Sequence, residues 1–129
     1  MDRKNISSGA PWEAVVGYSR AVRMGPFVYV AGTTAVDEIG QVIGSGDAYQ
    51  QAVFILQKIE KALLAAGAHL SNVVRTRMFV VDVADWAEIG RAHGEFFREI
   101  KPAATLVEVS GLIQPELLVE IEVDAIISE

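Results

Sequence analysis

The segment from 117 to 127 alternates between apolar and acidic residues, and this pattern constrains the fold more strongly than any other feature of the sequence. Its apolar side chains fall on one side, and Glu120, Glu122 and Asp124 fall on the other. Alternation with a period of two predicts a β-strand with one buried and one open face. A second strand is expected over 102–109, before a turn that contains glycine and proline. We expect both strands in the middle of the sheet, whose open face would carry Ala104, Glu108, Glu120 and Glu122.

The remaining pattern predicts three more strands and two helices. Strands are expected over 19–24, 27–31 and 73–83, and helices over 47–66 and 85–100. Each helix starts at an aspartate that is followed three residues later by glutamine or glutamate, which is the capping-box pattern. Two strand–helix–strand connections require parallel strands and place both helices on one sheet face. The expected fold class is therefore α+β, with a mixed sheet.

The first residues show no such periodicity. We expect an irregular start over 1–16, with Trp12 as an anchor. The first nine residues are mostly polar and lack the apolar core of a signal peptide, so no signal peptide is expected there. No apolar run approaches the length that spans a membrane, so a cytoplasmic protein without a membrane partner is expected. The length of 129 residues fits a single domain over 1–129.

Charge and composition exclude several classes of function. The net charge is −6 and no cluster of lysine and arginine occurs, which makes nucleic acid an unlikely partner. The chain has no cysteine, and its two histidines, His69 and His93, lie far apart, so no metal site is predicted. On the apolar stripe of the second helix, a buried and hydrogen-bonded His93 is favoured over a catalytic one. Hydrophobic residues make up 51% of the chain and also extend onto the open sheet face, at Phe79, Val81 and Leu106, so we expect an oligomer.

The charged residues of the open face allow two interpretations. Arg75 and Arg77 either bind an anion or form ion pairs with the acidic residues of neighbouring strands, and we favour ion pairs. Glu122 is expected to be a structural partner of this kind. Glu120 either pairs with an arginine or acts as a general base that holds a water molecule in an apolar cleft.

A series of short motifs carries a family resemblance. They are Gly-Tyr-Ser-Arg-Ala-Val at 17–22, Phe-Val-Tyr-Val-Ala-Gly-Thr at 27–33, Ala-Ala-Gly-Ala at 65–68, Val-Val-Arg-Thr at 73–76, Glu-Phe-Phe at 95–97, Lys-Pro-Ala at 101–103 and Val-Glu-Ile-Glu at 119–122. In this order the chain resembles the RidA/YjgF (endoribonuclease L-PSP-like) family from about 17 to 127. The resemblance implies a chorismate-mutase-like fold and a homotrimer with ligand clefts between subunits. It also implies hydrolysis of 2-imino acids or their enamine tautomers to 2-keto acids and ammonia, without a metal or an organic cofactor.

The resemblance assigns roles to individual positions and also shows departures from the family. Glu120 matches the acidic residue that positions or activates water, and Tyr18 matches the cleft tyrosine. The family's substrate-binding arginine is replaced by Ala104, which cannot form a bidentate contact with a carboxylate. A serine and an asparagine of the active members are replaced by Ala31 and Gly90. The substrate-binding positions implied are Tyr18, Ala31, Gly32, Thr33, Gly90, Arg91, Ala104 and Leu106.

Three functions are compatible with this sequence, which looks like a branch of the family that lacks the arginine. The first is a RidA-like homotrimer that binds a small carbonyl or imine metabolite and hydrolyses an imine or enamine without the usual carboxylate, with Glu120 orienting water and with Tyr18 and Thr33 lining the site. In this case Arg91 is either a replacement anchor or a solvated surface residue. The second is a non-catalytic trimeric ligand-binding or regulatory module. The third, a ribonuclease, ranks last because the chain is acidic.

Overall fold

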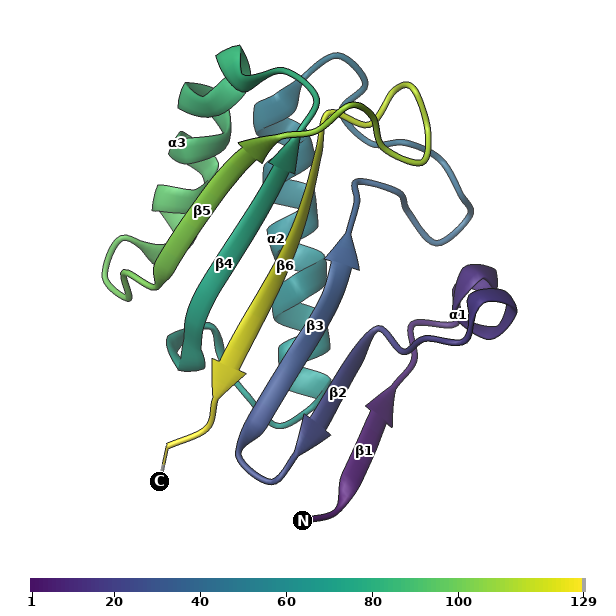
Figure 1. Ribbon diagram of the computed structural model, residues 1–129, viewed down its shortest axis with the longest axis vertical. Coiled ribbons are helices and arrows are strands. Elements are labelled where there is room, and N and C mark those ends of the chain that lie inside the picture. The colour runs from purple at the N-terminus through teal and green to yellow at the C-terminus, as the bar shows by residue number, and fades with distance from the viewer. Residues whose placement is uncertain (129) are drawn as a thin grey trace.

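The alternating C-terminal segment forms β6 (Val119–Ile126), which is the central strand of the sheet in a computed structural model that describes residues 1–128 (Figure 1). It lies between β3 (Phe27–Thr33) and β4 (Val73–Val80) and runs antiparallel to both. The apolar side chains of β6 from Val119 to Ala125 are buried and its acidic side chains are half-buried, as the alternation predicts. This strand therefore separates a core face from an open face.

The described residues form an α+β domain with a six-stranded mixed sheet, which confirms the predicted fold class. The strand order is β1-β2-β3-β6-β4-β5, and β4 and β5 form its parallel pair. Glu129, the last residue of the predicted domain, lies outside the described residues. The other elements, in chain order, are β1 (Arg3–Ile6), α1 (Pro11–Val16), β2 (Ala21–Met24), α2 (Ala48–Ala65), η1 (Leu70–Asn72), η2 (Val83–Asp85), α3 (Trp86–Phe97) and β5 (Ala103–Glu108).

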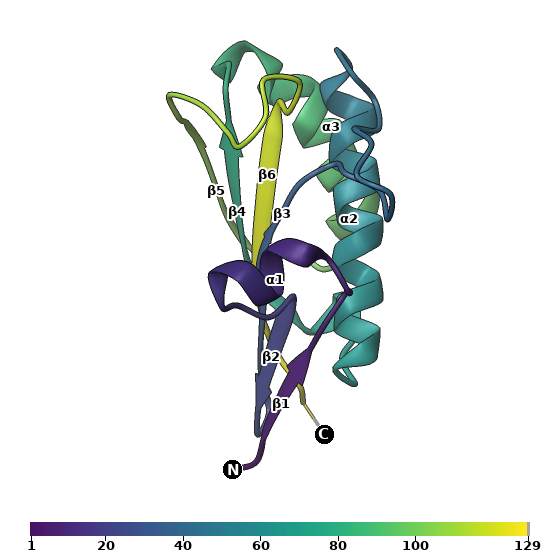
Figure 2. The same ribbon diagram turned by 90° about the vertical axis from the view of Figure 1, so that its right-hand side faces the viewer.

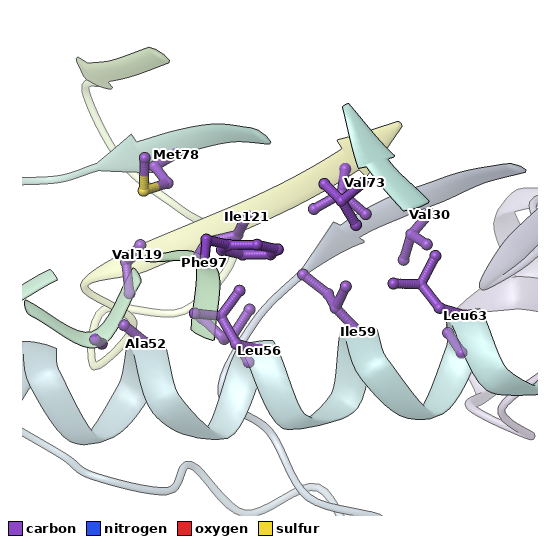
Figure 3. Close-up of a cluster of buried hydrophobic side chains, with 14 of the residues drawn as sticks. Val30, Ala52, Leu56, Ile59, Leu63, Val73, Met78, Phe97, Val119 and Ile121 are labelled. Atoms are coloured by element: carbon purple, nitrogen blue, oxygen red, sulfur yellow. The ribbon is translucent and has the colours of Figure 1, made fainter. Parts of the chain in front are cut away.

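Both long helices cover the same face of the sheet, as predicted, and leave the opposite face open (Figure 2). Helix α2 begins where the Asp47 side chain accepts a hydrogen bond from the Gln50 amide at 3.0 Å. Its apolar stripe points at the strands and packs against their buried side chains (Figure 3). The stripe consists of Ala52, Leu56, Ile59 and Leu63. Full burial of one such leucine or isoleucine contributes about 1.5–3 kcal/mol. Among residues 1–128, no helix is both long and apolar enough to cross a bilayer.

Strand β5 lies at the edge of the sheet, so its expected central position was wrong. Its parallel register with β4 sets Ala104 beside Thr76 and Leu106 beside Met78, on the face that the helices cover. The expectation that Ala104, Leu106 and Glu108 share the open face with Glu120 was therefore also wrong. Both sides of this strand carry apolar residues, and alternation alone cannot decide which side faces the core in such a strand.

The N-terminal segment is regular, in contrast to the irregular start that was expected over 1–16. Strand β1 pairs antiparallel with β2 at the sheet edge, and its mostly exposed polar residues explain the missing periodicity. Helix α1 has only six residues, with Pro11 at its start and a left-handed Gly17 at its end (φ 90°). Trp12 is 55% exposed and does not anchor the segment.

The start of the second helix also differs from the prediction. Asp85 makes no capping hydrogen bond with its side chain; Asp82 instead accepts from the Ala84 amide at 2.9 Å and caps the short η2 turn. Trp86, expected on the inward stripe, is 63% exposed. Ile89 is buried as predicted, and Ala92 and Phe97 are buried with it.

Candidate functional site

A groove of about 650 Å³ lies on the open face of the sheet. It is bounded by the segment between α1 and β2, by β3 and by the acidic side of β6. Three residues of the predicted site line it, namely Tyr18, Ala31 and Gly32. Glu13, Glu122 and Asp124 add carboxylates to its wall. Three of the four predicted site residues from the first third of the chain thus line one groove.

Glu120 lies directly against Gly32. A Cβ atom on Gly32 would clash with Oε2 of Glu120 and would lie 3.1 Å from its Cδ, so the glycine leaves the space that the carboxylate occupies. The residue opposite Glu120 on β4 is Phe79, so the carboxylate does not have an arginine as its cross-strand partner. Burial and the charge of Glu122 raise the pKa of Glu120, while the charge of Arg20 opposes this rise. A half-buried carboxylate of this kind suits proton transfer.

Arg20 connects the parts of this site, and no role was predicted for it from the sequence. Its side chain is 11% exposed. Its Nη1 donates to the Gly32 carbonyl oxygen at 3.0 Å and to Oγ1 of Thr33 at 2.8 Å, and its Nη2 lies 3.4 Å from the Tyr18 hydroxyl. The sequence position of Arg20 could have indicated this role, because an arginine at the start of a half-buried strand needs polar partners.

Glu13 on α1 forms an ion pair with Arg20, and no role was predicted for it from the sequence. It is 6% exposed, accepts hydrogen bonds from Ser7 and Ser8, and lies 4.0 Å from Nε of Arg20. Burial raises the pKa of Glu13, but the hydrogen bonds from Ser8 and Ser7 and the charge of Arg20 outweigh burial and hold the pKa below its ordinary value. Glu13 thus ties α1 to the wall of the groove.

The segment after β3 is held from the side of α2. Lys58 donates from Nζ to the carbonyl oxygens of Thr34 and Val36, each at 2.8 Å. Burial, together with the charge of Arg20, lowers the pKa of Lys58 to about 8. The Thr33 side chain is fully buried, accepts from Arg20 and donates to the Ala31 carbonyl oxygen at 2.8 Å. Thr33 therefore holds Arg20 and the Ala31 backbone in place but does not line the groove.

The ion pairs favoured for the open face are present at one of the two arginines. Arg77 contacts Glu122 at 3.2 Å and Asp124 at 3.3 Å. Within residues 1–128, Arg75 has no ion pair shorter than 4.0 Å, although Asp124 lies opposite it in the register. Glu122 is therefore a structural partner, which leaves Glu120 as the acidic residue of β6 without a cation at hydrogen-bond distance.

The other predicted site residues lie on a different part of the chain. Gly90 and Arg91 are exposed on α3, and Ala104 and Leu106 lie on β5, two strands away from β6. Arg91 pairs with Glu88 at 2.7 Å and its guanidinium lies 3.7 Å from the centre of the Tyr49 ring. The chain thus carries two separate groups of predicted residues, which we call the Glu120 half-site (Tyr18, Ala31, Gly32, Thr33 and Glu120) and the β5 half-site (Gly90, Arg91, Ala104 and Leu106).

His93 behaves as a structural histidine. Its Nε2 lies 2.9 Å from Oγ1 of the buried Thr76, and its ring packs against Phe97 at a centroid distance of 4.7 Å. Burial lowers its pKa. Across residues 1–128, histidine and acidic side chains form no group of three that could hold a metal ion.

Comparisons with known proteins identify the family. The family model described as "Endoribonuclease L-PSP" matches residues 8–127. This chain belongs to the RidA/YjgF family. Its 3-aminoacrylate deaminase relative, RutC from Acinetobacter baylyi, is 36% identical over 104 residues, which cover 81% of this chain and 82% of RutC. An uncharacterized protein of Streptomyces coelicolor is 38% identical over 122 residues, which cover 95% of this chain and 90% of that protein.

A solved structure agrees with the fold. A member of the YjgF/YER057c/UK114 family from Mycobacterium tuberculosis superposes with a TM-score of 0.89 and 48% sequence identity, and the match covers 98% of this chain and 100% of that one. The resemblance inferred from the short motifs is therefore confirmed.

Proposed function

We propose that this protein hydrolyses small imines or enamines at sites formed between the subunits of a homotrimer. The observation that carries the proposal is the Glu120 carboxylate, which stands half-buried against Gly32, has a raised pKa and has no arginine opposite it. The activity in the name of RutC, deamination of 3-aminoacrylate, supports the reaction class.

The chemistry requires one group that can take and return a proton. The ionised Glu120 accepts a proton from water as the water oxygen bonds to the carbon of the protonated imine, and the π electrons of the C=N bond move onto nitrogen, which gives a neutral carbinolamine. The carboxyl group then returns this proton to the nitrogen. As the C–N bond breaks, the hydroxyl oxygen forms the C=O bond and its proton passes to Glu120, so that a carbonyl product and ammonia leave and Glu120 releases the last proton to solvent. A raised pKa suits both steps, because a base is most effective when its pKa lies near the working pH.

The division into two half-sites supports a site shared between copies. Within one subunit, Ala104 is two strands from Glu120 and on the other side of the sheet. A neighbouring copy that places its β5 edge against the open face completes the site, and it also covers apolar side chains exposed there, among them Tyr29 and Val107. Since Ala104 supplies no cation for a carboxylate, the substrate we propose is an imine or enamine without that group.

A non-catalytic binding module is the second candidate, and the loss of polar side chains at Ala104 and Gly90 is the observation in its favour. Stabilisation by carbonyl compounds without turnover would support it. A ribonuclease remains the last candidate, and RNA binding that weakens with salt would support that function.

The test is hydrolysis of imines released by an amino-acid or amine oxidase, measured as protection from a trapping amine. We expect acceleration by the wild type, strongest with imines that lack a carboxylate, and loss of at least about 100-fold in Glu120→Gln. Glu99→Gln makes the same change at an exposed carboxylate and should keep full activity. Ala104→Arg should shift the preference toward 2-iminopropionate. Equal rates with and without wild-type protein on every imine would refute the proposal.

A further inference from the structure

The guanidinium of Arg20 contacts three parts of the Glu120 half-site at once. It donates to the Gly32 carbonyl and the Thr33 hydroxyl on β3, and it lies beside the Tyr18 hydroxyl at the groove wall. Its own backbone is fixed between β1 and β3, because its amide donates to Ile6 at 2.8 Å and its carbonyl accepts from Ala31 at 2.9 Å. A cation held this firmly can order the groups around it.

We propose that Arg20 is the positioning residue of the site: it fixes Gly32 and Tyr18 around Glu120 and supplies the positive charge that keeps the Glu120 carboxylate available as a base. This inference rests on the proposed hydrolysis. It assigns to Arg20 an effect on the reaction that acts through Glu120 and Tyr18 and not through contact with the substrate.

Arg20 supports β3 at a point where the strand ladder is irregular. The Gly32–Thr33 segment follows an irregularity in the β3–β6 register between Val30 and Thr33, where the regular ladder does not hold the backbone. The hydrogen bonds from Arg20 replace that support at the point where Gly32 faces the Glu120 carboxylate. Because the Tyr18 oxygen accepts from Arg20, its own proton points elsewhere and is free to be donated into the groove.

Charged residues on several elements surround Glu120 and Arg20. Glu122 on the same strand raises the pKa of Glu120, and Glu122 is itself paired with Arg77 on β4. Arg20 acts in the opposite direction, and its charge is balanced by Glu13 on α1. On the side of α2, Lys58 adds a second cation, whose pKa is lowered by burial and by the charge of Arg20. Arg20 is thus the cation that counteracts burial and Glu122 at Glu120.

The experiment is a titration of the Glu120 side-chain carboxyl by ¹³C NMR in the full-length protein, with the pH profile of kcat/KM measured alongside. Arg20→Gln removes the charge and should move the titration of Glu120, and the acid limb of the profile, to higher pH. Arg20→Lys keeps the charge and should leave both near the wild-type position. Glu13→Gln removes the balancing charge and should move both to lower pH.

A matched control lies on β2, the strand that follows Arg20 directly. Arg23 also donates to two carbonyl oxygens, those of Gly25 and Ala66, but does so away from the groove. Arg23→Gln should leave the titration of Glu120 unchanged. If Arg20→Gln unfolds because Glu13 loses its cation, Glu13→Gln and Arg20→Lys still test the direction of the effect.

The outcomes separate this inference from the proposed function. Opposite shifts in Arg20→Gln and Glu13→Gln support the role of Arg20, and the NMR titration shows them even without any turnover. An unchanged titration in both variants overturns the inference, including the case where imine hydrolysis by the wild type is confirmed. Loss of activity in Arg20→Gln with no shift in either profile would show that Arg20 only supports the fold.

Discussion

Replacing Gly32 by alanine should disable the site while leaving the fold intact. The backbone of Gly32 is outside the left-handed region, so alanine can adopt it without strain. The added methyl group would clash with Oε2 of Glu120, which is the end of a flexible side chain. We therefore expect the carboxylate to swing away by about 1 Å, and a displacement of that size in a catalytic group lowers the rate by about 100-fold.

Two measurements separate this effect from unfolding. Moving Glu120 off its preferred rotamer costs about 0.5–1.5 kcal/mol, so the free energy of unfolding in urea should change by no more than that. The matched control is Gly111→Ala, which adds the same methyl group where no heavy atom lies within 4 Å. A Gly32→Ala protein with wild-type kcat/KM would refute the reasoning. So would a loss of more than about 3 kcal/mol of stability, because the carboxylate would then be fixed in place.

Three further predictions follow from the charged groups. Glu13→Gln should lower the free energy of unfolding by about 1.5–3 kcal/mol at pH 7, because hydrogen bonds to a charged group are lost. Since the native pKa of Glu13 is lowered, this difference from wild type should shrink as the pH falls below 4.5. A pH-independent difference would contradict this prediction. Glu120→Gln should stabilise the protein at pH 7, because the raised pKa means that ionisation of Glu120 disfavours the native state. This gain in stability should vanish toward pH 4.5 in the same urea experiments. Destabilisation at pH 7 would show a structural role for Glu120 instead. The native pKa of Lys58 is about 8, so the native state releases this proton before the unfolded chain does. The stability of the wild type relative to Lys58→Met should therefore rise between pH 8 and 10.5. A stability difference that stays constant over this range, at constant ionic strength, would contradict the lowered pKa.

The core of the fold could be predicted because its strongest elements have one clear period. Strand β6 and helix α2 each bury the residues that the alternation and the helical stripe select. The side of β5 that faces the core could not be predicted, because Ala104 and Leu106 on one side and Thr105 and Val107 on the other are equally compatible with the core. The register with β4 decides it, and that register depends on pairing between distant segments.

Residues of the candidate site could be predicted only where they belong to a motif of the family resemblance. Tyr18, Gly32 and Glu120 were found through the family resemblance; Tyr18 and Gly32 line one groove, and the Glu120 carboxylate lies against Gly32. Glu13 and Arg20 were missed, because their relation depends on how α1 folds back, and a six-residue helix leaves almost no periodic signal.

The most direct test of the account is subunit complementation between two inactive variants. Glu120→Gln removes the base from the Glu120 half-site, and Ala104→Trp fills the β5 half-site. A homotrimer of three 13.9 kDa chains has a mass of about 42 kDa, which sedimentation can verify for each preparation. If each site joins the two half-sites of neighbouring subunits, random mixing in equal amounts gives every mixed trimer one intact site in three. Three-quarters of the trimers are then mixed, so about one quarter of the wild-type rate of imine hydrolysis should return. Mixed trimers without activity, formed from an active wild-type protein, would contradict the shared site.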